Sequence, residues 1–228
     1  MSVEEITDGI FRVDGKVATE NLNPGEKVYD EDLKKVDGVE YRFWNPYKSK
    51  PAAAFQKRIS DFPIKEGEEV LYLGVGDGTT ASHFSDIVGE EGVIIGVDIA
   101  DKAFENFMDL CEKRDNLIPV LEDANNPGMY SEYVPGGDEE SGEVDVIYQD
   151  IAQREQTEIL IKNVEKYLKD GGKFVLMVKA RSIDVTRPPG DIFEEQKKML
   201  KSRGYKIEEI KRLDPFEKDH AIIIGSKD

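Results

Sequence analysis

Residues 70–80, VLYLGVGDGTT, decide the fold of this chain. An apolar run over 70–73 leads into a turn with glycine at 74, 76 and 78, and Thr79-Thr80 then open a helical segment. A strand that passes through glycines into a helix offers a ligand the free N–H groups and the positive dipole end of that helix. The stretch therefore predicts a binding site for a carboxylate or a phosphate at the carboxyl end of a strand.

Downstream of this turn, apolar segments of strand length alternate with segments of helical pattern. The expected strands are residues 70–73, 93–98, 117–121, 144–148 and 173–178. Such alternation predicts a parallel sheet covered by helices on both faces. One helical stripe before the fifth strand is expected to end at Asp170-Gly171-Gly172, and residues 192–200 predict a further helix. The stripe consists of Leu160, Ile161, Val164, Tyr167 and Leu168.

The end of the chain has a different pattern. Residues 206–213 and 221–224 are strand-like, and the segment between them is too short for a crossover helix, so they are expected to pair as an antiparallel hairpin. Five parallel strands followed by a terminal hairpin is the order of the Rossmann-like, seven-stranded sheet of adenosylmethionine-dependent methyltransferases. The predicted fold class is α/β with this sheet.

The N-terminal segment favours a separate β-rich module. Short apolar stretches at 10–13, 16–18 and 39–43 are separated by turn pairs such as Asp14-Gly15 and Asp37-Gly38, which are hairpin signals. An alanine-rich run after Ser49 then predicts a helix, with Pro51 tolerated in its first turn. We expect a small module over residues 1–55 and a methyltransferase domain over 56–228.

Charge is distributed unevenly in this chain of 228 residues. Lys and Arg number 31 and Asp and Glu 48, so the net charge is −17, which should repel nucleic acid. Residues 121–150 hold nine acids and no Lys or Arg, whereas residues 41–60 hold five basic residues and no acid. The chain is therefore acidic with one small basic segment.

Other features exclude several classes of protein. The chain contains no apolar run near the roughly 18 to 20 residues that a membrane helix needs, so we expect no membrane association. The first six residues carry acids where a secretory signal carries basic residues, and the single cysteine, Cys111, cannot form an internal disulfide. A cytoplasmic location is expected. Cys111 and His83 are interpreted as structural residues.

An acid follows the glycine turn at the spacing that a ribose site requires. Asp98 closes the second strand, 24 residues after Gly74, where it can accept hydrogen bonds from both ribose hydroxyls. A dinucleotide fingerprint would need glycine where Thr79 stands, so adenosylmethionine is favoured over NAD or a purely structural turn. Hydroxyls of Thr79 and Thr80 could hold the amino-acid end of that cofactor, and Asp123 could accept the adenine amino group.

Three further segments are expected at the crevice edge of the sheet, where strands end, and a fourth comes from before the sheet. Together they could bring two lysines, a carboxylate and an imidazole into one place. These segments are residues 44–50, 148–153, 178–182 and 219–220.

At these segments the chain resembles the archaeal fibrillarin family of RNA 2′-O-methyltransferases, and the resemblance covers nearly all of the sequence. The loop reads Val75-Gly76-Asp77 where the family usually has Ala-Ala-Ser, and Asp98-Ile99 where it usually has Glu-Phe. The motifs that carry the resemblance are YRFWNPYKSKPAAA, VLYLGVGDGTT, VDVIYQDIAQ, MVKARSID and DPFEKDHAIII.

The resemblance implies a set of site residues. A Lys-Asp-Lys-His tetrad lines the active site of the family, and in this chain it corresponds to Lys50, Asp150, Lys179 and His220. S-adenosyl-L-methionine is the implied cofactor. Its contacts, together with the glycine turn, correspond to Gly74, Thr79, Thr80, Asp98, Ile99, Asp123, Ala124, Asp150 and Gln153.

The chemistry of a ribose 2′-hydroxyl fits this tetrad. The methyl group of a sulfonium is already activated, so catalysis consists of aligning the reacting atoms and removing the hydroxyl proton. Lys179 is the candidate general base, Asp150 would orient the lysines, Lys50 would hold the hydroxyl or a phosphate, and His220 would complete the orientation. No metal is expected.

An acidic enzyme needs partner molecules that bind the RNA, and the resemblance implies which partners these are. The expected partners are a box C/D guide RNA that pairs with target rRNA or tRNA, a Nop-type scaffold protein and a kink-turn-binding protein. Two alternatives stay open: a stand-alone methyltransferase with another acceptor, and a non-enzymatic scaffold subunit that keeps the fold. The presence of all four tetrad residue types argues against the scaffold.

Overall fold

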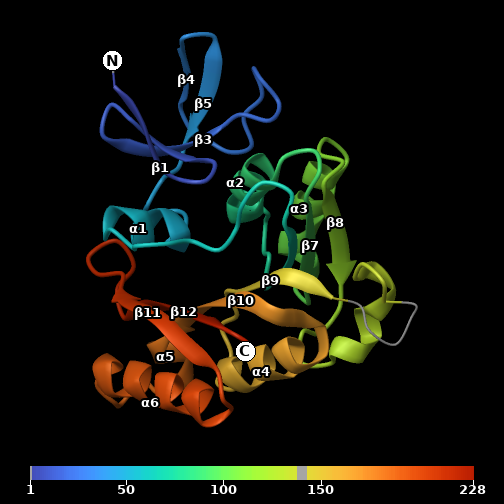
Figure 1. Cartoon of the computed structure of the whole chain (residues 1–228), viewed down its shortest axis with the longest axis vertical. Coiled ribbons are helices and arrows are strands. Elements are labelled where there is room, and N and C mark those ends of the chain that lie inside the picture. The colour runs from blue at the N-terminus through green and yellow to red at the C-terminus, as the bar shows by residue number, and fades with distance from the viewer. Residues whose placement is uncertain (1, 138–142) are drawn as a thin grey trace.

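The computed structural model describes residues 2–137 and 143–228 and consists of two sheets with their helices (Figure 1). Three of the nine acids of the 121–150 stretch, Asp138, Glu139 and Glu140, lie outside the described residues. Within the described residues, no helix is long and apolar enough to span a membrane.

The larger sheet confirms the predicted fold. Its strand order is β11-β12-β10-β9-β6-β7-β8, and β12 runs antiparallel to both of its neighbours. The predicted terminal hairpin is thus the β11–β12 pair, and β6 to β10 are parallel. The strands are β6 (Glu69–Leu73), β7 (Val93–Asp98), β8 (Leu117–Leu121), β9 (Val144–Gln149), β10 (Leu168–Lys179), β11 (Lys206–Arg212) and β12 (His220–Ser226).

Helices cover both faces of this sheet, as the alternation predicted. Successive strand residues point to opposite faces, so Tyr72 packs into the core shared with α2 and α3, whereas Leu71 packs into the core shared with α4 and α6. The helices are α2 (Thr79–Val88), α3 (Asp101–Cys111), α4 (Gln156–Tyr167), α5 (Ala180–Ile183) and α6 (Pro189–Ser202), with a 3-10 helix η1 (Pro127–Tyr133).

The predicted end of α4 is wrong. The helix ends at Tyr167, and Leu168 already has extended backbone and pairs with Val144 of β9. Leu168 is buried in this extended conformation, so its apolar side chain still contributes to the core. The glycines lie instead within β10, where Gly171 has φ +77° and the pairing register shifts before Lys173.

The N-terminal segment forms the predicted β-rich module as an antiparallel sheet of order β1-β2-β3-β5-β4. Asp14-Gly15 and Asp37-Gly38 make its hairpin turns as expected. Two of its strands, β1 and β4, were not predicted. The elements are β1 (Val3–Thr7), β2 (Ile10–Val13), β3 (Lys16–Glu20), β4 (Leu33–Val36) and β5 (Val39–Phe43), followed by α1 (Lys50–Gln56).

This module shares its core with the larger sheet. Trp44 is buried against Phe55 of α1 and Phe84 of α2, and its ring stacks on His83 at 4.7 Å between centroids. Residues from β2, β3, α1 and α2 belong to one apolar cluster. The division at 55/56 stays a prediction.

Charged side chains are also buried where the module meets α2. The Asp86 carboxylate on α2 forms ion pairs with the guanidinium groups of Arg42 and Arg114, each at 2.7 Å. Arg42 also forms an ion pair with Glu31 at 2.9 Å. All four side chains are at most 2% exposed. We call these four residues the Asp86 network; its two positive and two negative charges balance.

His83 lies beside the Asp86 network as a neutral ring. The Thr19 hydroxyl donates its single proton to Asp86 and therefore accepts from His83 Nδ1 at 2.8 Å. His83 Nε2 then accepts the Tyr29 hydroxyl at 2.6 Å. Burial, together with the charges of Arg42 and Arg114, holds the pKa of His83 well below its usual value. The structural interpretation of His83 agrees with these contacts.

Candidate active site

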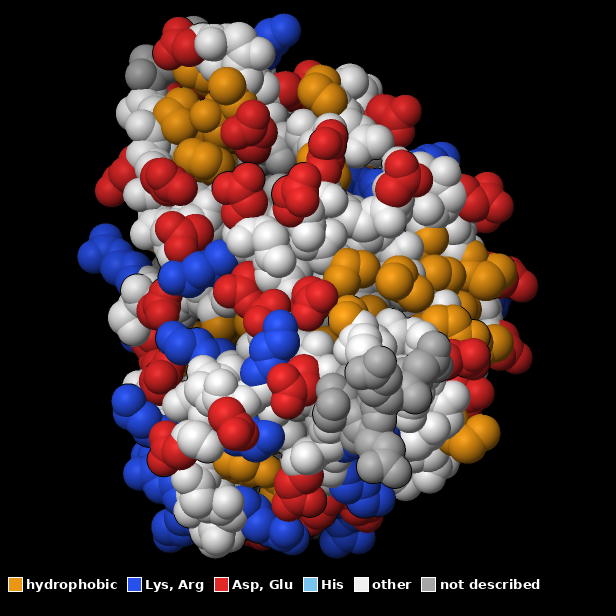
Figure 2. All heavy atoms as spheres, turned by 45° about the vertical axis from the view of Figure 1, so that its right-hand side comes forward, with side chains coloured by type: hydrophobic (Ala, Val, Ile, Leu, Met, Phe, Trp, Pro, Cys, Tyr) orange, Lys and Arg blue, Asp and Glu red, His pale blue; other side chains and the backbone are white. Residues whose placement is uncertain are grey.

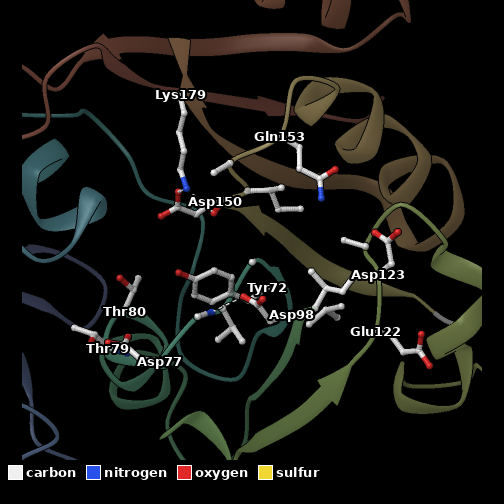
Figure 3. A pocket seen from close by; sticks show the side chains of 18 of the residues that line it. Tyr72, Asp77, Thr79, Thr80, Asp98, Glu122, Asp123, Asp150, Gln153 and Lys179 are labelled. Atoms are coloured by element: carbon white, nitrogen blue, oxygen red, sulfur yellow. Dashed lines mark hydrogen bonds and ion pairs between the residues drawn. The ribbon is translucent and has the colours of Figure 1, made fainter. Parts of the chain in front are cut away.

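A cavity of about 700 Å³ opens at the carboxyl ends of β6 to β10 (Figure 3). This is the sheet edge at which the sequence predicted a ligand site. All nine residues predicted to bind the cofactor line the cavity: Gly74, Thr79, Thr80, Asp98, Ile99, Asp123, Ala124, Asp150 and Gln153.

The glycine turn brings the backbone of two segments together. Gly74 has φ +83°, and a Cβ at this residue would lie 2.8 Å from the carbonyl oxygen of Asp150. A side chain at position 74 would therefore displace the segment that carries Asp150. Gly78 has φ +82°, and a Cβ there would lie 2.7 Å from the ring of Phe107, so α2 could not begin so close to α3.

Asp98 is held rigidly at the end of β7. Its Oδ2 accepts the Gly76 N–H at 2.7 Å, and its Oδ1 accepts the Ala100 N–H at 2.9 Å. Each carboxylate oxygen keeps a further lone pair that can accept a ligand hydroxyl. Asp98 thus fixes the glycine turn and also presents an acceptor to the cavity.

The two threonines lie at the first turn of α2. Thr80 is buried, and its hydroxyl shares a hydrogen bond of 2.9 Å with Ser49, the residue before α1. Thr79 is half-buried, and its N–H donates to Asp77 Oδ1 at 3.0 Å. The hydroxyl of Thr79 has room for a ligand, whereas the hydroxyl of Thr80 already joins α2 to the N-terminal module.

The opposite wall of the cavity is formed by the ends of β7, β8 and β9. Figure 3 places Asp123 and Gln153 on this wall, away from Thr79 and Thr80. Ile99, after Asp98, is 61% exposed, so its apolar surface is available to a flat ligand.

Three of the four predicted tetrad residues meet directly. Lys50 Nζ lies 2.9 Å from Asp150 Oδ2, and Lys179 Nζ lies 2.8 Å from Oδ1. Lys179 Nζ also donates to the Asp150 carbonyl oxygen at 3.0 Å. Figure 3 shows the Lys179 side chain extending toward Asp150 at the cavity rim. We call Lys50, Asp150 and Lys179 the Lys-Asp-Lys cluster.

The charge of this cluster is unbalanced. Its side chains are 13–17% exposed and carry two positive charges against one negative charge. Burial raises the pKa of Asp150, but the charges of Lys50 and Lys179 and their hydrogen bonds outweigh burial, so this pKa is below its usual value. Asp150 is therefore ionised at neutral pH, and the cluster presents a net positive charge to the cavity.

His220 lies next to the cluster in the sheet but is oriented differently. As the first residue of β12, it pairs in register with Lys179. Its Nδ1–H donates to the Lys218 carbonyl oxygen at 2.7 Å, and Nδ1 lies 4.0 Å from Glu217 Oε2. Among the contacts of the described residues, none joins the His220 ring to the Lys-Asp-Lys cluster.

Several lining residues were not predicted. Tyr29 and Lys48 reach the cavity from the N-terminal module, and Tyr72 and Glu122 reach it from β6 and from the residue after β8. Tyr72 and Glu122 could have been found from the rule that strand ends line the crevice. No sequence signal indicated Tyr29, because its position depends on the hydrogen bond to His83.

Comparison with known proteins identifies the family. The family model named Fibrillarin matches residues 1–228. The chain belongs to the fibrillarin family. The resemblance noted in the sequence is thereby confirmed.

Individual relatives match this chain over nearly their whole length. The fibrillarin-like rRNA/tRNA 2′-O-methyltransferase of Methanocaldococcus jannaschii is 44% identical over 230 residues, which cover 99% of this chain and 96% of that protein. The crystal structure of Aeropyrum pernix fibrillarin in complex with natively bound S-adenosyl-L-methionine is 41% identical, with a TM-score of 0.86 and coverage of 99% of this chain and 98% of that one. The structure of a fibrillarin/Nop5p complex contains a chain that is 40% identical, with a TM-score of 0.86 and coverage of 98% and 100%.

The cavity of this protein fits an adenosylmethionine-type ligand on its own geometry. It offers a carboxylate acceptor on β7, a threonine hydroxyl at the start of α2, and an exposed apolar side chain at Ile99. The turn at Gly74 leaves no room for a Cβ, so backbone rather than side chains lines that side of the cavity. These groups match a ribose, an amino acid and an aromatic base.

Proposed function

We propose that this protein methylates ribose 2′-hydroxyls of rRNA and tRNA at positions selected by a box C/D guide RNA. It is an enzyme, and its cofactor is S-adenosyl-L-methionine. A Nop-type scaffold protein and a kink-turn-binding protein complete the proposed assembly. The observation that carries the proposal is the Lys-Asp-Lys cluster at the rim of the cofactor cavity.

Each residue of the cluster has its own role in the proposed reaction. When bound, the cofactor supplies a methyl group on a positively charged sulfur, which needs only an aligned oxygen nucleophile. Lys50 holds the substrate ribose or an adjacent phosphate through its ammonium group. Asp150 fixes both lysines through its two oxygens. Lys179, which lines the cavity, takes the hydroxyl proton once its amine is free of its own proton.

The remaining site residues are assigned to binding and orientation. Asp98 accepts the ribose hydroxyls of the cofactor, and Thr79 holds its amino-acid end. Asp123 and Gln153 face the adenine from the opposite wall. His220 supports Lys179 from the neighbouring strand, where the two residues are in register.

Guide dependence follows from the charge of the molecule. The net charge is −17, and Figure 2 shows acidic side chains spread across the visible face, with basic side chains mostly along its left edge and lower part. Such a surface repels a phosphate backbone, and a few cations near the cavity provide only local contacts. Partner proteins and a paired guide therefore have to deliver the target.

The test compares the isolated protein with the assembled complex. Target RNA is incubated with the cofactor and with the protein alone, with the protein partners, or with the partners and guide RNA, and 2′-O-methyl groups are then mapped. We expect methylation at one guided position only in the full assembly. A guide RNA with a shifted complementary region serves as the control and should move the modified position by the same shift.

Two results would contradict the proposal. Efficient methylation of many RNA positions by the isolated protein would support a stand-alone methyltransferase. An assembly that binds the cofactor and the target but leaves every 2′-hydroxyl unmodified would support a scaffold subunit.

A further inference from the structure

The end of β10 has no neighbouring strand on one of its two sides. On that side β10 pairs with β9, and the last residues in register are Leu176 and Gln149, where β9 ends. On the other side the Ala180 N–H still donates to the Asp219 carbonyl oxygen at 3.1 Å. Successive residues of a strand direct their backbone groups to opposite sides, so the N–H and C=O of Lys179 face the side that β9 no longer covers. These two groups need another partner.

One side-chain amide takes the place of the missing strand. Gln156, the first residue of α4, is fully buried. Its Oε1 accepts the Lys179 N–H at 3.0 Å, and its Nε2 donates to the Lys179 carbonyl oxygen at 3.4 Å. Nε2 also donates to the Gln153 carbonyl oxygen at 2.9 Å. A primary amide has two N–H donors and one carbonyl oxygen, so Gln156 uses all of them on backbone groups beside the cavity.

These contacts join two segments whose relative position matters for methyl transfer. Lys179 and Gln153 both line the cofactor cavity, and they come from β10 and from the segment between β9 and α4 (Figure 3). We propose that Gln156 is a positioning residue for the reaction: it fixes the end of β10 so that the amine of Lys179 stays within reach of the oxygen that is methylated. The inference rests on the proposed function, because it takes Lys179 as the proton acceptor.

The start of α4 is itself anchored to the end of β9. Gln149, the last residue of β9, is fully buried, and its Nε2 donates to the Gln156 carbonyl oxygen. The next residue is Asp150, whose carboxylate contacts Lys179 Nζ at 2.8 Å. Lys179 is therefore fixed at its backbone through Gln156 and at its amine through Asp150. Both attachments lead back to the same strand end.

The position of this lysine is expected to affect the rate strongly. A base accepts a proton only across a hydrogen-bond distance, and a displacement of about 1 Å at a reacting group can lower a rate roughly 10²-fold. Gln156 is not among the described residues that line the cavity. Its effect on the reaction therefore passes through the residues that it holds.

The first test measures the single-turnover rate of the assembled complex at saturating RNA and saturating cofactor, which removes effects on cofactor binding through Gln153. Gln156→Met keeps an unbranched side chain of similar length but loses all three amide hydrogen bonds, and the rate should fall roughly 10-fold or more. The same substitution in a Lys179→Ala protein should cause no further loss, because the lysine through which Gln156 acts is then absent. A merely structural role would lower the rate by the same factor in both backgrounds.

The matched control is Gln196→Met. Gln196 of α6 is also buried and also contacts α4, where its Oε1 accepts the Thr157 hydroxyl at 2.7 Å. This substitution should leave the rate unchanged in a protein that urea denaturation shows to be folded. Gln156→Asn, which shortens the side chain by one methylene and withdraws the amide from Lys179, is the second test variant and should act in the same direction as Gln156→Met.

The second test needs no activity. Hydrogen exchange of the Lys179 amide in the isolated full-length protein should be faster in Gln156→Met than in the wild type, because this N–H loses its acceptor. Exchange at Lys179 should be unchanged in Gln196→Met.

The outcomes separate this inference from the proposed function. A wild-type rate in Gln156→Met, or an equal loss in the wild-type and Lys179→Ala backgrounds, would overturn the inference while guided methylation stands. Unchanged exchange at Lys179 in Gln156→Met would also overturn it. A wild-type assembly that leaves its target unmodified would contradict the proposed function, and faster exchange at Lys179 in Gln156→Met would then still support the role of Gln156 in fixing the strand end.

Discussion

The Asp86 network and the Lys-Asp-Lys cluster are both groups of ionised side chains, but they differ in exposure and in charge balance. The Asp86 network is at most 2% exposed and has equal numbers of positive and negative groups. The Lys-Asp-Lys cluster is 13–17% exposed and has one positive charge in excess. Buried charges persist only when they are fully paired, whereas a partly open site can keep an excess charge for a ligand. Charge balance therefore distinguishes the structural group from the chemical one.

The largest expected effect comes from breaking the balanced group. Asp86→Ala leaves Arg42 and Arg114 without their shared carboxylate, and the free energy of unfolding should fall by about 3–5 kcal/mol. Urea denaturation at neutral pH measures this change. The control is Glu165→Ala, which breaks an ion pair with Arg203 that is 55% exposed on both sides and should cost at most about 1 kcal/mol. Equal effects of the two substitutions would show that the Asp86 network does not stabilise the fold more than an exposed ion pair does.

A smaller effect, confined to catalysis, is expected at the unbalanced group. Lys179→Ala should keep cofactor binding and lose roughly 10²-fold or more in the single-turnover rate of the assembled complex, as expected for the loss of a general base. Lys179→Arg should not restore the rate, because a guanidinium keeps its proton.

Another lysine of the same strand provides the control for Lys179. Lys169, near the opposite end of β10, also pairs with two carboxylates, Glu69 and Asp145, but lies outside the cavity. Lys169→Ala should leave the rate unchanged. Near-normal turnover in Lys179→Arg would mean that the lysine positions the substrate by its charge and that another group accepts the proton.

The smallest expected effect is a pH dependence of stability that comes from His83, which lies beside the Asp86 network. The folded protein holds the pKa of His83 well below its usual value of 6.5, so below that pH the unfolded chain binds a proton that the folded protein does not. The contribution of His83 to the free energy of unfolding should therefore be fully present above pH 6.5. It should decrease as the pH falls, by up to about 1.4 kcal/mol per pH unit. Urea denaturation between about pH 7.5 and 5 measures this slope. His83→Gln should have a shallower slope, and identical slopes would show that His83 protonation does not limit folding.

Much of the larger sheet could be predicted from the sequence because its signals are local. Glycine at 74 and 78 marks the turn, and apolar runs mark the central strands. The strands β1 and β4 of the smaller sheet escaped prediction because charged residues interrupt them, as in Val3-Glu4-Glu5 and Leu33-Lys34-Lys35, and their side chains are largely exposed or half-buried. Their pairing depends on neighbouring strands and not on their own pattern.

The same contrast holds for the site. Asp98 was predicted because it closes a strand whose end reaches the crevice, and Asp150 because the residues after β9 reach the same crevice and match the tetrad of the family. The contribution of Tyr29 could not be predicted, because it results from a buried contact between the N-terminal module and α2. The orientation of the His220 ring toward Lys218 is likewise set by the local loop and was not visible in the sequence.

The Lys-Asp-Lys cluster also has a consequence for the order of synthesis. Lys50 and Asp150 are 100 residues apart in sequence, and Lys179 follows another 29 residues later. Nascent chains emerge from the ribosome N-terminus first, so the residue that begins α1 is made long before the strand end that completes the centre. A chain that stops during translation before β10 can contain the whole N-terminal module and the glycine turn, yet it lacks Lys179. With the proposed role of Lys179, methyl transfer would begin only after most of the chain has been made.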